Sequence, residues 1–441
     1  MNPHRFPEVL ARSAVFHITA DGLPLDVLEH SAADYSSFEC EGSVRIEVAL
    51  PSAPGKVVIR PLRHDIQAEI EGRRLRFTLA GPQYIQIEIE GLPLLYLYAL
   101  PPAPEAPSGP NVKRFEGGKI HDAGEIILGS GDVCWIEAGA VVRGNVRAVA
   151  ASGIRIGGYG VLDGGIWQER GETRRKAISF DACTDSRVEN ILMLSPSSWM
   201  VVLGGCSDVE VSGVRQIADN YGSDGVDIVG SRRIRITGCM LHNGDDNIAV
   251  KAIYRNPTGQ GVTVLAPGQA HGDWNSTVED VLVSGCAFYC INGGSAMEIG
   301  YETSTDHIRN IRFEDIDVLG VHSFGSVFGI HTGDRALVEN ITWDNIRVEH
   351  HYDKLVDLRV VWSRWNRDSE HGSVRSIGFR NIRVAQIPPN IGYTLSVIAG
   401  FDAAHPVSDV LFEDFELGGR QVANADQLDL VTRHAHQILF R

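Results

Sequence analysis

The sequence lacks an excess of positive charge. Lys and Arg together number 40 against 56 Asp and Glu, which gives a formal net charge of −16. Nucleic acids and anionic membranes bind to basic faces, so this balance argues against both as partners. It argues more weakly against a polyanionic substrate, because a local basic cleft can form within an acidic protein.

Long apolar runs are absent too. No stretch reaches the roughly 18 apolar residues of a membrane span. The N-terminal segment Met1–Leu10 has no apolar core of the kind that signal peptides carry. We therefore expect a cytoplasmic protein, or a secreted one if a leader has been removed.

Cysteine pairs with metal-site spacing are absent as well. The chain has seven cysteines, and only Cys286 and Cys290 lie close together. Because no second pair completes a zinc site, we interpret the cysteines as small buried side chains. We predict no metal and no other cofactor.

Segments with helical periodicity are nearly absent, which indicates an all-β protein. A proline-rich stretch at residues 101–112 divides the chain, and proline at this density makes a stiff extended connector. We therefore predict an N-terminal domain at residues 1–100 and a larger domain at residues 113–441.

The N-terminal segment contains five short runs in which apolar and polar residues alternate. Period-two patterning between turn residues predicts a small antiparallel β-sandwich. The runs are Ser43–Leu50, Lys56–Arg60, Arg74–Leu79, Tyr84–Ile89 and Leu94–Ala99.

The C-terminal segment repeats a unit of strand, turn and strand. From Val209 onward its successive starts differ by 25, 47, 30, 30, 36 and 33 residues. No such unit can bury its apolar face alone, so the units must stack, which predicts a right-handed parallel β-helix. A propeller blade would need four strands and about 40 residues. Cys239 with Cys286, and Ile316 with Ile346 and Ile382, should form ladders inside the coil.

Three aspartates are spaced by about one coil. Asp224 precedes the pair Asp245–Asp246 by 21 residues, so all three should meet on neighbouring rungs. Clustered carboxylates hold each other's protons and can divide acid and base roles. Glycoside hydrolysis needs one carboxylic acid for the leaving oxygen and a second carboxylate that activates water or attacks the sugar.

Structural interpretations of these aspartates are also open. Asp is common in β-helix turns, where it accepts hydrogen bonds from backbone amides. The segment Gly222–Asp227 faintly echoes calcium-binding nonapeptide repeats, but those occur in tandem and the chain has one copy.

The segments around these aspartates resemble glycoside hydrolase family 28, the polygalacturonases. The family carries Asn-Thr-Asp-Gly-(apolar)-Asp and, one coil later, (Asn/Gly)-x-Asp-Asp-Cys-(Ile/Val)-Ala-(Ile/Val). This chain has Asn220-Tyr-Gly-Ser-Asp-Gly-Val-Asp-Ile228 and Asn243-Gly-Asp-Asp-Asn-Ile-Ala-Val-Lys251. The resemblance implies an inverting glycosidase in which Asp245 is the general acid and Asp224 and Asp246 activate water. Asp227 also fits the pattern, and we interpret it as structural.

Two departures from the family pattern concern the substrate. The family's Gly-Gly-His-Gly-(apolar)-Ser-Ile-Gly is here Gly293-Gly-Ser-Ala-Met-Glu-Ile-Gly300, so Ser295 replaces a histidine and Glu298 is added. The family's Arg-Ile-Lys, which binds galacturonate, has Gly329-Ile-His331 as its counterpart. Both cations are lost, so we expect a neutral sugar. Dextranases and isopullulanases of family 49 share the fold, the aspartates and an N-terminal β-sandwich, and this chain resembles that wider clan.

Further residues are candidates for substrate binding, each with a structural alternative. Lys251 could keep an aspartate ionised. Trp274 could stack on a sugar face or simply pack within its loop. The other candidates are Ser295, Glu298, Glu302, His331 and His271, and the segment Trp362–Trp365 could line a cleft. A long loop at residues 252–276 could wall off one end of the groove, which would favour exo action.

We therefore expect a glycoside hydrolase that acts on a neutral poly- or oligosaccharide, such as a dextran-like glucan. Three alternatives stay open. The first is a polygalacturonase-type pectin hydrolase, and the second is a non-catalytic carbohydrate-binding β-helix. The third is a pectate-lyase-like enzyme, which would need calcium and a basic residue as its base; no Asp-rich calcium cluster with a nearby Arg is evident in the sequence.

Overall fold

The computed structural model of the protein describes residues 1–171, 174–253, 274–366, 368–385 and 395–441. The chain forms two compact units. One comprises Met1–Asp122, Val133–Arg143 and Ile156–Leu162, and the other comprises Ala123–Asp132, Gly144–Arg155 and Asp163–Arg441.

The N-terminal strands form two five-stranded sheets. In order across each sheet, the first contains β1 (Asn2–Pro3), β4 (Asp34–Glu39), β10 (Leu95–Leu100), β9 (Gln83–Ile89) and β6 (Val57–Arg60). The second contains β3 (Leu23–Pro24), β2 (His17–Ala20), β5 (Val44–Ala49), β8 (Arg74–Leu79) and β7 (Glu69–Glu71). Alternate residues such as Ile46, Phe77, Ile87 and Leu97 are buried in a shared core.

The five strands predicted in this segment match β5, β6, β8, β9 and β10 to within one residue. One pairing differs from a purely antiparallel sandwich. Strands β4 and β10 run parallel, with Asp34 opposite Leu95 and Glu39 opposite Leu100. The residues of β4 are nearly all buried, so the strand lacks the alternation that marks a half-exposed strand in a sequence.

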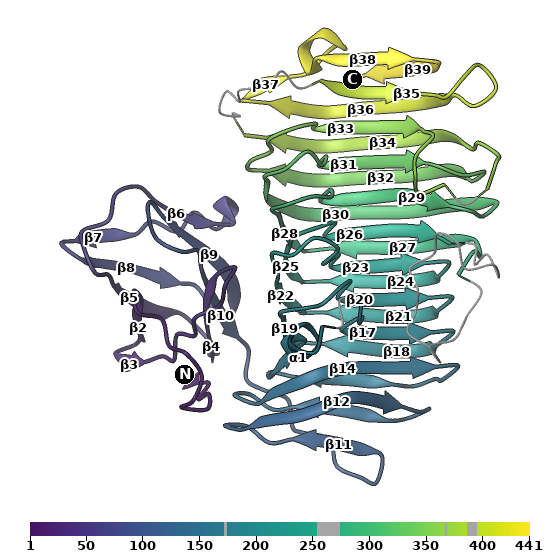
Figure 1. The fold of residues 1–441 in the computed structure, drawn as a ribbon. Coiled ribbons are helices and arrows are strands. Elements are labelled where there is room, and N and C mark those ends of the chain that lie inside the picture. The colour runs from purple at the N-terminus through teal and green to yellow at the C-terminus, as the bar shows by residue number, and fades with distance from the viewer. Residues whose placement is uncertain (172–173, 254–273, 367, 386–394) are drawn as a thin grey trace. The chain divides into compact units, whose positions relative to one another are not determined.

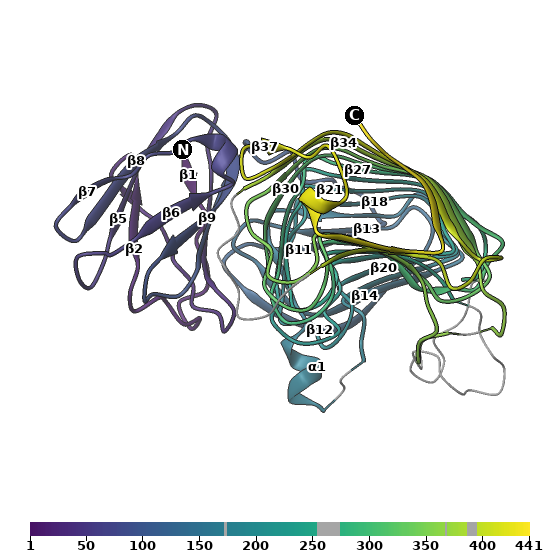
Figure 2. The same cartoon turned by 90° about the horizontal axis from the view of Figure 1, so that it is seen from above.

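The strands from β11 to β39 form a parallel β-helix, which confirms the predicted fold class. They make one 29-stranded sheet in which almost every pairing runs parallel between successive coils. Figure 1 shows the strands stacked as rungs, and in Figure 2 the coils superpose when seen from above. Neighbouring rungs of such a stack lie about 4.8 Å apart.

Three series of strands succeed one another up the coil after the opening strands. The opening strands are β11 (Val112–Phe115), β12 (Ile120–Leu128), β13 (Val133–Ile136), β14 (Val141–Val149), β15 (Arg155–Gly158) and β16 (Val161–Asp163). The series that carries the candidate site is β17 (Ile178–Asp181), β20 (Val201–Gly204), β23 (Val226–Val229), β26 (Ile248–Ala252), β29 (Met297–Thr303), β31 (Phe328–Thr332), β33 (Val356–Val360), β35 (Ser396–Ala399) and β38 (Leu430–Arg433).

The other two series merge in the upper coils. One is β18 (Thr184–Glu189), β21 (Ser207–Ser212), β24 (Arg232–Thr237), β27 (Val278–Ser284), β30 (His307–Val321), β32 (Leu337–Val348), β34 (Ser373–Val384), β36 (Val407–Leu417) and β39 (Ala435–Phe440). The other is β19 (Leu192–Leu194), β22 (Arg215–Ile217), β25 (Met240–Asn243) and β28 (Ala287–Cys290), which β30 continues; a short hairpin strand, β37 (Arg420–Gln421), follows β36.

The interior of the coil holds ladders of like residues. Ile316, Ile346 and Ile382 are opposite one another in register, as predicted. The amide of Cys239 lies 3.4 Å from Cys286 Sγ, and both cysteines are buried. A longer ladder stacks Phe313, Trp343, Phe379, Phe412 and Phe440, with successive ring centroids 5.8, 4.9, 4.7 and 4.8 Å apart.

Helices are scarce among the described residues. They comprise one short α-helix, α1 (Gly165–Glu169), and two 3-10 turns at Leu62–His64 and Asp426–Leu428. Within the part of the chain that the structure describes, no helix has the length and apolar character needed to cross a membrane.

The aromatic ladder should carry a large share of the stability of the coil. Phe379 is fully buried between Trp343 and Phe412, so Phe379→Ala would leave a cavity. We expect the free energy of unfolding to fall by about 3–5 kcal/mol. Urea unfolding followed by circular dichroism measures this, with Trp362→Ala as control because Trp362 is 65% exposed. An equal loss of unfolding free energy in the two variants would contradict a stabilising role of the ladder.

Candidate active site

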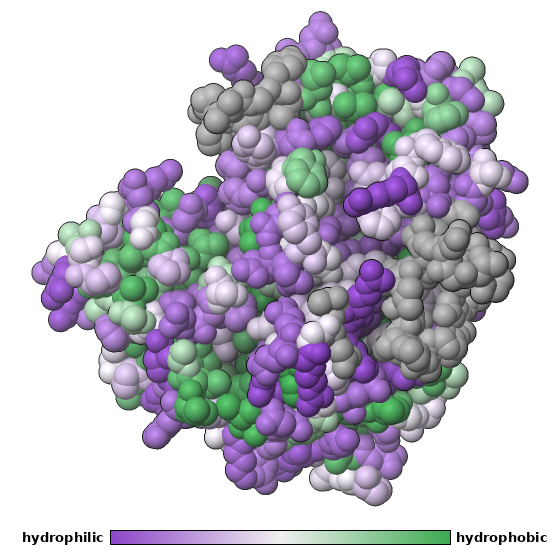
Figure 3. All heavy atoms as spheres, viewed as in Figure 1, coloured by the Kyte–Doolittle hydropathy of each residue, from purple (hydrophilic) through white to green (hydrophobic). Residues whose placement is uncertain are grey.

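A cavity of about 460 Å³ opens on the strand series that includes β23, β26, β29, β31 and β33. Its lining comes from the residues just before these strands and from the far ends of the strands. Hydrophilic residues predominate over the middle of the coil on the face shown in Figure 3. Asp224, Asp245 and Asp246 all line this cavity.

The register of the strands brings the three aspartates together. Val226 pairs with Ile248, and Asp224 and Asp246 each stand two residues before these partners. The two side chains therefore occupy equivalent positions on neighbouring rungs, and Asp245 lies next to them. One carboxylate oxygen of each aspartate lies within 4.8 Å of the others. The meeting predicted from the 21-residue spacing is thus present in the structure.

Backbone amides hold two of the carboxylates in place. The amide of Ser295 donates to Asp246 Oδ1 over 2.6 Å, and the amide of Gly222 donates to Asp245 Oδ2 over 2.9 Å. Ser295 stands two residues before Met297, which pairs with Ile248, so it continues the column of Asp224 and Asp246. Its hydroxyl lies 3.1 Å from that of Ser326 on the next rung. Ser295 thus contacts the trio through its backbone.

A buried lysine binds one aspartate of the trio. Lys251 Nζ lies 2.7 Å from Asp224 Oδ2 and 2.8 Å from Asp227 Oδ1. Burial lowers the pKa of Lys251, but the charges of Asp224 and Asp227 more than offset this, so the net shift is upward. Lys251 therefore stays charged and places its ammonium group against the carboxylate of Asp224. Asp227 is fully buried and shares the same ammonium group.

The other two carboxylates hold protons more tightly than free aspartate. Burial, followed by the charge of Asp224, raises the pKa of Asp245 to about 6. Burial and the charges of Asp245 and Asp224 raise the pKa of Asp246 well above its ordinary value. The three groups compete for charge, as closely spaced carboxylates do. The site therefore combines one carboxylate in contact with an ammonium group and two carboxyls whose pKa values are raised.

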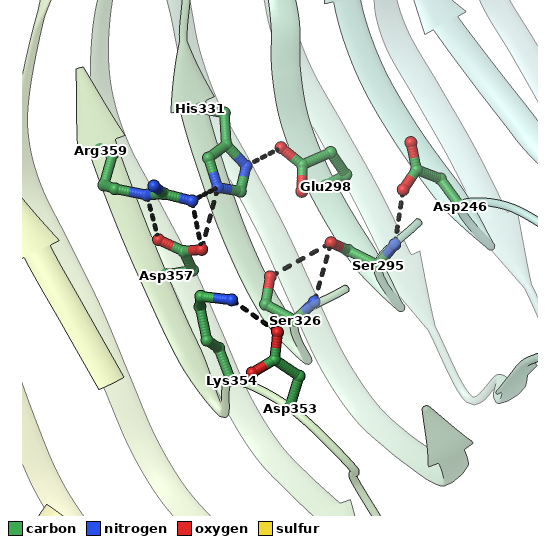
Figure 4. Close-up of polar contacts among 9 residues, drawn as sticks. All are labelled: Asp246, Ser295, Glu298, Ser326, His331, Asp353, Lys354, Asp357 and Arg359. Atoms are coloured by element: carbon green, nitrogen blue, oxygen red, sulfur yellow. Dashed lines mark hydrogen bonds and ion pairs between the residues drawn. The ribbon is translucent and has the colours of Figure 1, made fainter. Parts of the chain in front are cut away.

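A second group of charged residues lies on the rungs above the trio. Figure 4 shows Glu298, His331, Asp357 and Arg359 pointing toward one another from β29, β31 and β33. His331 Nδ1 lies 2.7 Å from Glu298 Oε1, and Nε2 lies 3.2 Å from Asp357 Oδ2. Burial lowers the pKa of His331, but the charges of Glu298 and Asp357 prevail and raise it to about 9. His331 is therefore an imidazolium at neutral pH.

Three residues in or beside this group, Asp357, Arg359 and Tyr301, escaped the sequence analysis. Arg359 donates from Nε and Nη2 to Asp357 over 2.5 and 2.7 Å, and both residues line the cavity. Tyr301 stacks on the His331 ring with centroids 4.4 Å apart. Register was the signal that could have found Arg359, because Gly300, His331 and Arg359 are opposite one another on successive rungs.

The cavity also contains more cations than the motif comparison indicated. Lys354, Arg359 and Arg364 line it, although Gly329 and His331 replace the Arg and Lys of the family motif. Lys354 Nζ lies 2.6 Å from Asp353 Oδ2. Arg364 lies over the ring of Trp365, 4.5 Å from its centroid. Trp365 belongs to the lining, so the expected contribution of the segment Trp362–Trp365 holds for its last two residues.

Trp199 also lines the cavity, one rung below Asp224. The Nζ atoms of Lys176 and Lys251 lie 3.8 and 4.2 Å from its ring centroid. Lys176 is buried and donates to Ser198 Oγ over 2.9 Å. Burial lowers the pKa of Lys176 to about 8, although Asp227 and Asp224 oppose the shift. No motif singled out either residue.

The remaining candidates are spread more widely. Glu302 lines the cavity, whereas Glu298 lies behind it and contacts His331. Trp274 is 4% exposed and packs against Val202 and Val229. Its Nε1 donates to Asp181 Oδ1 over 3.0 Å, and it is not among the residues that line the cavity. His271 and most of the 252–276 loop lie outside the described residues.

The three aspartates are also the described residues whose geometry could hold a metal ion, since their oxygens lie within 4.8 Å of one another. Lys251 already supplies a positive charge to Asp224 at 2.7 Å.

Comparison with known proteins agrees with this geometry. Residues 136–349 match the family model described as glycosyl hydrolases family 28, and this range includes all three aspartates, Lys251, Ser295 and His331. The match confirms the resemblance to polygalacturonase-like glycoside hydrolases that the motifs predicted.

Curated relatives carry names from the same class. Probable exopolygalacturonase C of Aspergillus terreus is 30% identical over 155 residues, which is 35% of this chain and 29% of that protein. Probable endopolygalacturonase B of Aspergillus flavus is 25% identical over 224 residues, which is 46% of this chain and 60% of that protein. The chain thus spans less than two thirds of the length of either relative.

Among solved structures, Dex49A from Penicillium minioluteum shares the fold. The TM-score is 0.71 at 14% identity, and the match covers 99% of this chain and 96% of that one. At this identity the likeness concerns the fold.

The raised pKa of Asp245 has a consequence for stability. The fold favours protonated Asp245, so its contribution is fully present below the ordinary pKa of about 4 and is lost as pH rises through about 6. Asp245→Asn removes the charge. We expect the variant to be more stable than the parent at pH 7 by up to about 3 kcal/mol, and no more stable at pH 4.

Urea unfolding at pH 4, 5, 6 and 7 measures this difference. Asp306→Asn serves as the matched control, because the Asp306 side chain is 79% exposed. Parallel pH profiles for Asp245→Asn and the parent protein would contradict the raised pKa.

Proposed function

We propose that the protein is a glycoside hydrolase that cleaves O-glycosidic bonds with Asp224, Asp245 and Asp246. The observation that carries the proposal is the meeting of three carboxylates in a cavity, with oxygens within 4.8 Å and one ammonium group on Asp224. Hydrolysis of a glycosidic bond needs a carboxylic acid that protonates the leaving oxygen. It also needs a second carboxylate that activates water, or attacks, at the anomeric carbon.

The surroundings of the aspartates support a division of roles. Asp245, with a pKa of about 6, retains a proton in mildly acidic solution and can donate it to the leaving glycosidic oxygen. Asp224 contacts the ammonium group of Lys251 at 2.7 Å, and its carboxylate would accept a proton from water as the water attacks the anomeric carbon. Asp246, fixed by the amide of Ser295, would orient that water.

We propose that the reaction inverts the anomeric configuration. Two hydrogen bonds of about 2.8 Å span roughly 5.6 Å, so a single water molecule fits between oxygens 4.8 Å apart. The trio is nevertheless tighter than the roughly 6.5–9.5 Å between carboxyl groups of most inverting enzymes. The proposal of inversion therefore rests on the family resemblance and on the space for water.

We further propose a neutral glycan as the substrate. A uronate carboxylate needs a cation that protein carboxylates leave available. In this cavity Lys251 binds Asp224 and Asp227, His331 lies between Glu298 and Asp357, Arg359 binds Asp357, and Lys354 binds Asp353. Each of these four cations already has at least one carboxylate partner, so hydroxyl groups are better ligands for the cavity than a second anion.

A galacturonide substrate is the second candidate. Its support is Arg364, which lines the cavity and contacts the face of Trp365. The curated relatives named as polygalacturonases point in the same direction. Binding without catalysis is the third candidate, and it differs from hydrolysis in that the parent protein would release no product.

Replacing the proposed acid tests the catalytic assignment. Asp245→Asn should lower kcat by about 10²–10⁴-fold, because the amide cannot donate the proton. In the parent protein kcat/KM should fall as pH rises through about 6, where Asp245 loses that proton. Steady-state kinetics measures both effects, and Asp306→Asn should leave the rate unchanged. A parent protein that binds glycans but releases no product would support the non-catalytic alternative.

A substrate panel tests the specificity. Isomalto-, malto- and galacto-oligosaccharides and oligogalacturonides are incubated with the enzyme, and proton NMR follows the anomeric configuration of the first product. We expect release from a neutral oligosaccharide with inversion. Retention would contradict the water-activation role of Asp224 and Asp246, and release from oligogalacturonides alone would contradict the neutral pocket. Single sugars or longer fragments as products distinguish exo from endo action.

A further inference from the structure

Exposed aromatic side chains gather in the cavity. Five aromatic residues are largely exposed among the described residues: Tyr221, Phe324, Tyr352, Trp362 and Trp365. Three of them, Tyr221, Phe324 and Trp365, line the cavity that holds the aspartates. Their exposed fractions are 67%, 68% and 41%. Most other large rings of the described residues are buried, so the exposed rings in this cavity indicate a local function.

The three rings are spread along the axis of the coil. Tyr221 lies beside the trio, three residues before Asp224. Its ring lies against the backbone of Gly293, because a Cβ at Gly293 would be 3.0 Å from Tyr221 Cε1. Phe324 precedes β31, and Trp365 follows β33. These strands are two and three rungs above β26, so the rings lie roughly 10 and 14 Å along the axis from the aspartates.

The groups between these rings are polar. Ser326, Glu302 and Lys354 line the same stretch of the cavity. Arg364 lies over one face of the Trp365 ring and adds hydrogen-bond donors there, which leaves the other face for a sugar. The apolar surface is therefore divided into separate rings with hydrogen-bonding groups among them. A protein or membrane partner would favour a continuous apolar patch, whereas a sugar chain offers apolar ring faces bordered by hydroxyl groups.

We propose that Tyr221, Phe324 and Trp365 form a row of sugar-stacking subsites that binds one neutral glycan chain along the coil axis. The proposal rests on the proposed function, because the row is continuous with the cavity of the three aspartates. Trp199 lines the cavity one rung below Asp224, before β20. Phe324 and Trp365 lie on the other side of the trio, so the glycan chain extends across the trio toward these two rings, and sugars beyond the cleaved bond contribute to binding.

Affinity electrophoresis tests this proposal without relying on catalysis. The probes are dextran, linear β-glucan, galactan and polygalacturonate, each cast in a native gel. The parent protein should be retarded by at least one neutral polysaccharide. Phe324→Ala and Trp365→Ala should each weaken that retardation about 3- to 10-fold. Trp362→Ala is the matched control, because Trp362 is 65% exposed but does not line the cavity. Phe324→Tyr should restore binding, since it retains the ring.

The outcomes separate this inference from the proposed hydrolysis. Retardation that is equal in Phe324→Ala, Trp365→Ala and Trp362→Ala would overturn the subsites, as would retardation by polygalacturonate alone or by no polysaccharide. Loss of retardation in the two cavity variants, together with a parent protein that hydrolyses nothing, would keep the subsites and overturn the hydrolase. In an active enzyme the two variants should raise KM for long substrates more than for disaccharides.

Discussion

The parallel backbone pairing between successive coils is the constraint on which the site depends. The pairing of Val226 with Ile248 fixes Asp224 beside Asp246. The pairing of Ile248 with Met297 places the amide of Ser295 within hydrogen-bonding distance of Asp246. The same register aligns His331 with Arg359. A shift of one residue in any of these pairings would turn the side chains to the other face of the strand. The chemistry of the cavity is therefore set by backbone hydrogen bonds that are far more numerous than the catalytic groups.

Electrostatics then decides what these aligned side chains can do. Three carboxylates in one cavity repel one another, and one buried ammonium group compensates only part of their charge. Lys251 settles on Asp224 and Asp227, which leaves Asp245 and Asp246 to carry protons. Two rungs higher, His331 is enclosed by Glu298 and Asp357. Lys251 and His331 are thus both bound by carboxylates of the protein itself. The two groups of charged residues differ in that only the lower one, around Lys251, includes partly exposed carboxyls, those of Asp245 and Asp246.

Much of the fold and part of the site could be predicted from the sequence. The recurring strand units gave the β-helix, because each unit has an apolar face that only stacking can bury. The aspartates could be found because their spacing equals a coil whose turns are short. Arg359 and Trp365 could not be placed in the same way, since the coil lengths above the trio vary between 30 and 36 residues and hide the register. Trp274 lies within the longest interval, where spacing does not predict which way a side chain points, and its ring is buried against Val229. Strand β4, and with it the parallel pairing of β4 with β10, was missed because β4 is almost entirely buried and its sequence shows no alternation.

The aromatic ladder inside the coil has a consequence for how such a protein can change over evolution. Phe313, Trp343, Phe379 and Phe412 repeat one contact from rung to rung, with centroids 4.7 to 5.8 Å apart. A complete coil can therefore be duplicated or deleted above the aspartates while every remaining ring keeps a neighbour of the same kind. The smallest heritable step in the length of the groove is then one whole coil. Groove length can be selected independently of the bond-cleaving chemistry, because the rungs that hold the aspartates are left unaltered.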